Sequence, residues 1–230
     1  MINSVRNTVM FLLNKDNRGF ITPSEFDYFA KQAQLEIFEG YFSEYARAIS
    51  LQNARRKAQG YGDIANQIQN KIDIFTTSTL LSINNDSLGG YYGLPANQYK
   101  IINLINEGKV VQEVQKHKWD MIVNSRLMAP STTYKMYRRL GEKLYVSPAP
   151  TSTATLNYIR KPEDPHWGYE SILGDPVYSS SSSTDFELPP SDEADLVIRI
   201  CKYAGLSVRE KDVIEVTNAI ETQEFQKKNT

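Results

Sequence analysis

The chain has little of what binds metals or forms disulfides: one cysteine, Cys201, and two histidines among 230 residues. A single cysteine excludes an intramolecular disulfide and leaves no second thiolate for a zinc site. Cys201 lies in an apolar run, where a free cysteine usually serves as a small buried side chain. This cysteine usage is typical of a reducing compartment.

The chain also lacks an excess of either charge and any long apolar run. Lysine and arginine number 26 and aspartate and glutamate 27, so the formal net charge is −1. This balance argues against a dominant nucleic-acid-binding face. No stretch approaches the roughly 20 apolar residues of a membrane-spanning helix, so we expect no membrane segment. The hydrophobic residues, 40% of the chain, suffice for one substantial core or two small lobes.

Motifs that mark catalytic sites are missing as well. The sequence contains neither G-x-S-x-G nor H-E-x-x-H. His117 and His166 each lie close to a tryptophan and to no candidate nucleophile. The segment Gly89–Gly93 lacks the Lys-Ser/Thr of a phosphate-binding loop, and we expect a flexible loop that exposes Tyr91 and Tyr92. We therefore expect no enzyme, no catalytic residue and no cofactor; an enzyme that uses His117 or His166 is the weakest alternative.

Residues 14–25 have the spacing of a calcium-binding EF-hand loop. Asn14 and Asp16 occupy its first and third positions, and Glu25 occupies the bidentate twelfth. Arg18 stands at the fifth position, where a guanidinium offers no oxygen and repels a divalent cation. Asn14, Asp16 and Glu25 are therefore weak metal candidates. A calcium-responsive binding module that uses this loop remains the alternative function.

The same segment carries the signals of a helix start. Thr22 and Glu25 have capping-box spacing, and Pro23 stands at the first helical position. In such a box the glutamate reaches back to the backbone N–H of the cap residue instead of a metal. We favour this interpretation, which makes residues 14–25 the entrance to a long helix.

Apolar periodicity predicts helices at 4–13, 23–58 and 64–72. The long helix 23–58 carries two apolar stripes that together cover about half of its circumference, which predicts two packing partners. One partner is a candidate neighbouring subunit, and the alternative is an ordinary core within the chain. Both interpretations apply to four aromatic residues, Phe38, Tyr41, Phe42 and Tyr45.

Beyond the third helix, β-branched and aromatic residues predict strands between 76 and 162, with a short helix at 116–127. The serine run Ser179–Ser183 is expected to be a hairpin tip or surface loop, with Ser181 as a contact candidate. A C-terminal helix pair follows within 189–230. Its predicted signals are a start at Ser191, a stop at Gly205 and a second capping box from Ser207 to Glu210.

These segments predict an α+β fold in which N- and C-terminal helices form a helical bundle with an inserted antiparallel β subdomain. Three regions are expected. Residues 1–75 form a helical region, residues 76–188 a mainly antiparallel β subdomain with loops, and residues 189–230 a helix pair that packs on the N-terminal helices.

Three passages resemble virion proteins of short-tailed phages, especially the crAss-like group. Residues 19–34 resemble the opening of those proteins, residues 158–167 the end of their β subdomain, and residues 185–213 their closing helix pair. The helical–β–helical order is similar to that of the head-to-tail adaptor, or ring, proteins that stack beneath the portal. The matching motifs are caps and turns, which mark a fold and carry no chemistry.

The resemblance implies a non-enzymatic virion protein, assembled in the host cytoplasm, that forms a homo-oligomeric ring of commonly twelve subunits. Such a ring joins the portal protein to other ring or tail proteins and continues the channel. Genomic DNA passes through that channel without specific binding, and no membrane is involved. A ring interface is heterologous, because one face of a subunit meets a different face of its neighbour. The fourteen tyrosines suit such interfaces, and Tyr91, Tyr92 and Ser181 join the four helical aromatics as contact candidates.

Overall fold

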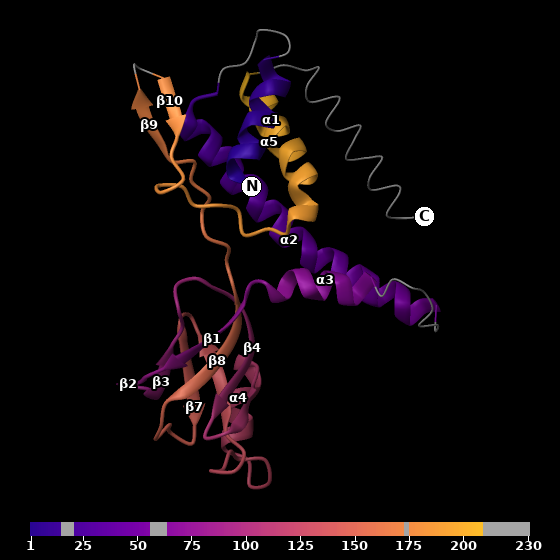
Figure 1. Cartoon of the computed structure of the whole chain (residues 1–230). Helices are drawn as coiled ribbons and strands as arrows, with labels where there is room; N and C mark the ends of the chain where they lie inside the picture. Colours follow the sequence, from indigo (N-terminus) through magenta and orange to yellow (C-terminus); the bar gives the residue numbers. More distant parts are fainter. Residues whose placement is uncertain (15–20, 56–63, 173–174, 209–230) are drawn as a thin grey trace. The chain divides into compact units, whose positions relative to one another are not determined.

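The computed structural model describes residues 1–14, 21–55, 64–172 and 175–208, and the chain divides into two compact units (Figure 1). The helical unit comprises Met1–Ile72 and Pro162–Thr230, and the β unit comprises Asp73–Lys161. The chain passes between the units twice. The protein is thus a mixed α+β protein, as the sequence predicts.

The helical unit is built from helices and one small hairpin. Its elements are α1 (Ile2–Asn14), α2 (Pro23–Arg55), α3 (Ile64–Asp73, whose last residue belongs to the β unit), β9 (Tyr169–Ile172), β10 (Asp175–Tyr178), the 3₁₀ turn η1 (Pro190–Asp192) and α5 (Glu193–Val208). Helix α5 contacts both α1 and α2. The buried side chains recur every three or four residues, as helices packed on one side require: Val5 and Val9, Phe26, Ala30, Ala33 and Ile37, and Leu196, Ile200 and Ala204.

The first three helices start and end close to the predicted limits. Helix α2 starts at Pro23 as expected and is described to Arg55, while the predicted residues 56–58 lie outside the described part of the chain. The predicted stop at Gly205 is wrong, because α5 continues through it to Val208. A glycine in the last turn weakens a helix without ending it when the preceding turns are anchored by packing.

The β unit is a single sheet of eight strands with one short helix. Its elements are β1 (Thr76–Leu81), β2 (Ile83–Asp86), β3 (Gly89–Gly93), β4 (Gln98–Asn106), β5 (Lys109–Glu113), α4 (Lys116–Val123), β6 (Met136–Leu140), β7 (Lys143–Ser147) and β8 (Ala154–Arg160). The strand order is β1-β8-β4-β5-β6-β7-β3-β2. Every pairing is antiparallel except the short parallel pairing of β5 with β6.

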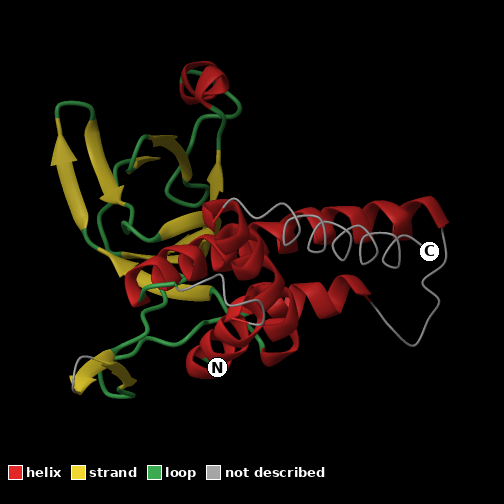
Figure 2. Cartoon of the chain, turned by 90° about the horizontal axis from the view of Figure 1, so that it is seen from above, coloured by secondary structure: helices red, strands yellow, loops and turns green. Residues whose placement is uncertain are grey.

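The order of the strands requires the sheet to curl (Figure 2). Strands β1 and β2 stand at opposite ends of the order, yet Ser82 alone separates them in the chain. Since consecutive Cα atoms are about 3.8 Å apart, the two edge strands must approach each other there. The concave side encloses a core that includes Leu81, Tyr92, Leu104, Val111, Tyr137, Leu144 and Leu156.

Two predictions for the β region are corrected. Gly89–Gly93 is not a flexible loop but strand β3, which pairs with β2 on one side and β7 on the other. The predicted limit at residue 188 is also too late, because Pro162 and the residues after it group with the helices. Trp167 illustrates the reason: its backbone N–H donates to Asp27 of α2 at 2.9 Å.

Candidate functional site

The loop that resembles an EF-hand ends in a helix cap. The backbone N–H of Thr22 donates to Glu25 at 2.8 Å, and the N–H of Glu25 donates back to the Thr22 hydroxyl at 3.3 Å. This confirms the capping box. The backbone hydrogen bond from Thr22 lowers the pKa of Glu25. Asp16 lies outside the described residues, and Asn14 is the last residue of α1.

Among the residues that the structure describes, no three His, Cys, Asp or Glu side chains lie close enough together to hold a metal ion. The two histidines lie in different units. His117 is exposed on α4, and the Nδ1 atom of His166 lies 2.7 Å from Asp27. Within the described part of the chain, the His166 side chain forms this one hydrogen bond, to an aspartate. Neither a serine nor a cysteine, which a histidine base could activate, takes part in it.

Asp27 and His166 instead fasten the segment around Trp167 to the first two helices. The Trp167 indole donates to Asn3 at 3.2 Å, and the guanidinium of Arg6 lies 3.7 Å from the centre of its ring. Arg6 is buried, and burial lowers its pKa against the opposing attraction of Asp27. This cluster holds the segment around Trp167 against α1 and α2.

The second buried polar cluster joins α2, α3 and η1 around Asp192. The Lys71 ammonium lies 2.5 Å from the Asp192 carboxylate, and the Tyr41 hydroxyl donates to the same carboxylate. Burial alone would raise the pKa of Asp192, but the hydrogen bonds from Lys71, Tyr41 and Ser191 outweigh it and hold the pKa below its ordinary value. The pKa of Tyr41 is raised, first by burial and then by the carboxylate. The cluster ties three elements together.

Ser191 is not the predicted helix cap. It lies inside η1, whose N-cap is Pro189, and its hydroxyl donates to the Asp192 carboxylate at 2.9 Å instead of accepting from a backbone N–H. Ser207 lies within α5 and therefore does not start a helix, and Glu210 lies outside the described residues. The proline pair 189–190 sets the turn, and the buried carboxylate determines where the serine hydroxyl points.

The predicted contact aromatics of α2 divide into two groups. Phe38 and Tyr41 are buried in the helical unit, so they are core residues. Phe42 and Tyr45 are half-buried. Phe38 and Phe42 pack edge to face, with ring centres 5.2 Å apart.

In the β unit, Tyr92 is not an exposed contact residue. Its ring is fully buried, and its hydroxyl donates to the carbonyl of Ser152 at 2.6 Å. Tyr91 is half-buried and packs against Tyr145, with ring centres 5.5 Å apart. Ser181 is exposed, as expected of a contact candidate, and follows the base of the β9–β10 hairpin rather than forming its tip.

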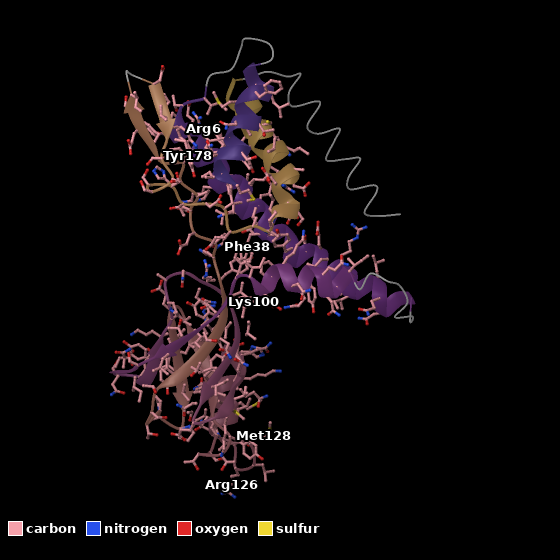
Figure 3. All side chains as sticks on the ribbon, viewed as in Figure 1. Arg6, Phe38, Lys100, Arg126, Met128 and Tyr178 are labelled. Carbon is pink, nitrogen blue, oxygen red and sulfur yellow. The ribbon has the colours of Figure 1, made fainter. Side chains whose placement is uncertain are left out.

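A surface that the sequence analysis missed lies in the loop after α4. Leu127 is 97% exposed and Met128 59% exposed. The Ser125 hydroxyl accepts hydrogen bonds from the backbone N–H groups of both residues, at 3.4 and 3.2 Å. With Arg126 these residues form a turn, which we call the tip (residues 126–128), and Figure 3 places Arg126 and Met128 at one end of the β unit. The signal was available in the sequence, as an Arg-Leu-Met run between a helix pattern and a proline.

The second missed surface is one face of the β9–β10 hairpin. Opposite residues of an antiparallel pair share a face, and faces alternate along each strand. The register therefore places Glu170, Ile172, Asp175 and Val177 on one face, which we call the outer face of the hairpin. Ile172 is 53% and Val177 46% exposed.

The opposite face of the hairpin carries Tyr169 and Tyr178. Both rings pack against Trp167, with centroid distances of 5.7 and 5.9 Å. Figure 3 shows Tyr178 and Arg6 in this part of the helical unit. An isolated two-stranded hairpin is marginal in water, and its attachment to Trp167 explains how it presents an ordered outer face.

Comparisons with known proteins add no identity: no protein-family model matches the chain, and no curated protein matches it. None of the described helices is long and apolar enough to cross a membrane.

Proposed function

We propose that the chain is a non-enzymatic structural protein of a phage virion that assembles as an oligomeric ring between the capsid portal and the tail. The helical–β–helical order and the three passages that resemble phage ring proteins support this proposal. The N- and C-terminal helices then form one bundle that carries the β unit, an arrangement favoured by the contacts of α5 with α1 and α2.

The observation that carries the proposal is the C-terminal part of α2. Phe38, Phe42, Tyr45 and Ile49 follow one another at spacings of four, three and four residues, which places them along one face of the helix. Phe38 is fully buried, the next three are half-buried, and Leu51 is 44% exposed. The last buried side chain described in α2 is Tyr41, although the helix continues to Arg55.

Among the residues that the structure describes, this stripe of α2 stays partly exposed beyond Tyr41 and can accept a further contact. Helices in proteins owe most of their stability to burial of an apolar face, not to intrinsic propensity. The half-buried stripe therefore offers a neighbouring subunit a ready contact, and a ring closes when this face meets a different face of the next subunit. In the proposed assembly, twelve such subunits line a channel, contact the portal and other tail proteins, and let DNA pass without specific binding.

Native mass spectrometry and negative-stain microscopy of the purified chain test the proposal. We expect rings of one subunit number, alone or after addition of the portal of the same phage. Ile49→Glu together with Leu51→Glu should abolish the rings and leave a folded monomer, whereas Tyr28→Glu, at an exposed position of the same helix, should leave them intact. Monomers in every condition, with or without the portal, would refute the ring.

The calcium-responsive module is the alternative, and the hydrogen bonds of the Glu25 carboxylate make it the less favoured one. Its Oε2 atom accepts from both the backbone and the hydroxyl of Thr22, at 2.8 and 2.7 Å. A calcium ion would have to displace these bonds. Isothermal titration calorimetry with calcium should therefore show no binding heat. Micromolar affinity that Glu25→Ala abolishes would overturn the choice.

A further inference from the structure

The two units carry opposite charge, although the whole chain is almost neutral. The β unit, Asp73–Lys161, holds 11 basic and 6 acidic residues and has a formal charge of +5. The helical unit holds the other 15 basic and 21 acidic residues and has a formal charge of −6. Unlike units of two copies therefore attract and like units repel, over roughly the 8–10 Å that screening allows at physiological salt.

The basic unit presents apolar side chains on its tip. Leu127 and Met128 stand out from a turn held by the Ser125 hydroxyl, and Arg126 adds a positive charge beside them. Lys118 is exposed on the preceding helix α4. An ordered turn that displays two large aliphatic side chains next to an arginine has the composition of a contact element, because isolated chains usually expose such groups singly.

The acidic unit presents the matching composition on the outer face of the hairpin. Ile172 and Val177 are about half exposed. Across the hairpin, Asp175 lies opposite Ile172 and Glu170 lies opposite Val177. The attachment of the other face to Trp167 holds this face outward. One small patch therefore combines two aliphatic side chains with two carboxylates, as the tip combines two aliphatic side chains with the cation of Arg126.

We propose that the tip of one copy docks on the outer face of the hairpin of a second copy. Leu127 and Met128 pack on Ile172 and Val177, and Arg126 pairs with the two carboxylates. The interface is heterologous, so each copy keeps one tip or one hairpin free for the next, and the assembly propagates until it closes. The inference rests on the proposed ring and names one of its contacts.

Charge-reversal variants of the full chain test this contact by sedimentation velocity. In a tip-reversed variant, Arg126→Glu and Lys118→Glu oppose the acidic hairpin. In a hairpin-reversed variant, Glu170→Lys and Asp175→Lys oppose the basic tip. We expect each variant alone to associate at least tenfold more weakly than the wild type, because like charges face each other across a contact.

An equimolar mixture of the two variants should associate as the wild type does. Each negative tip then meets a positive hairpin, and each unaltered tip an unaltered hairpin, so the variants alternate and assemblies contain equal numbers of both. The control for the tip-reversed variant is Lys100→Glu with Lys161→Glu. It makes the same change in net charge as the tip reversal, at exposed positions elsewhere in the β unit, and should leave association unchanged. Raising the salt concentration should weaken the wild-type assembly.

Three outcomes overturn the inference: a wild type that stays monomeric at its highest soluble concentration in low salt, reversed variants that associate normally, or a mixture that fails to restore association. Rings that form while both reversals are silent refute this contact and leave the proposed ring intact. Alternating pairing of the variants without any closed ring supports this contact and refutes the ring.

Discussion

Replacement of Lys71 by methionine tests the packing of the helical unit most directly. The Lys71 ammonium lies 2.5 Å from Asp192, whose side chain is buried, whereas the lysine side chain is one-third exposed. Removal of one partner of a fully buried ion pair costs about 3–5 kcal/mol, because the other charge stays buried and unpaired. Partial exposure of Lys71 reduces this, and we expect a loss of about 2–3 kcal/mol in the free energy of unfolding.

Replacement of the other partner, Asp192→Asn, should lower the free energy of unfolding by less. Lys71 then turns its ammonium into water, and the asparagine oxygen still accepts the hydrogen bond from Tyr41, so we expect about 1 kcal/mol. The double variant should be more stable than the sum of the two losses predicts, by on the order of 1–2 kcal/mol. The prediction is thus an asymmetry between two removals of the same ion pair.

The pH dependence has a definite sign. The pKa of Asp192 is held below its ordinary value, so its contribution to stability is present above pH of about 4 and is lost as pH falls through the folded pKa. In Lys71→Met the loss of the cation raises the pKa of Asp192, and protonation on acidification relieves the buried charge. The stability difference from wild type should therefore shrink as pH falls from 7 toward 4.

Urea unfolding followed by far-UV circular dichroism at pH 7, 5 and 4 measures these differences. A loss of 2–3 kcal/mol corresponds to a fall of about 5–10 °C in the melting temperature for a unit of this size. The reasoning is refuted if Lys71→Met and Asp192→Asn lower the free energy of unfolding equally, if their losses add in the double variant, and if neither loss changes with pH. The buried carboxylate is then not what the lysine stabilises.

Three further predictions concern single positions. Thr22→Ala should cost about 1 kcal/mol of stability by removing the cap of α2. The cap lowers the pKa of Glu25, so in an acid titration of stability the contribution of Glu25 should disappear as pH falls through that pKa. Gly90→Ala should lose about 1–3 kcal/mol in urea unfolding, since the new Cβ would lie 2.7 Å from a proline ring; Gly93→Ala, with no atom closer than 4.0 Å, should be tolerated. Burial raises the pKa of Cys201 to about 11, so iodoacetamide at pH 8 should leave the native thiol unmodified and label it within minutes in urea; equal rates in both would contradict its burial.

The features predicted correctly from the sequence are those decided by neighbours in the chain. The capping box of Thr22 and Glu25 spans four residues, and its hydrogen bonds need no partner outside them. Helix limits follow from a periodicity that is itself local. For such features the tertiary structure adds little to what the residues already dictate.

The features missed depend on partners far along the chain. Asp192 follows a proline pair and has the sequence context of a helix start, but its partners Tyr41 and Lys71 lie 151 and 121 residues away. Gly89–Gly93 is rich in glycine and becomes a strand because β2 and β7 pair with it on both sides. In both cases local secondary-structure propensity predicts the structure poorly, since contacts with distant residues override it.

The near-neutral net charge was a weaker guide than it seemed from the sequence, because it averages two units of opposite sign. A charge of +5 on the β unit by itself would also attract DNA. The tip places Leu127 and Met128 beside its cation, and exposed aliphatic side chains gain nothing from a phosphate backbone but much from an apolar protein face. The composition of the tip therefore favours a protein partner over DNA, and the outer face of the hairpin has a composition that complements it.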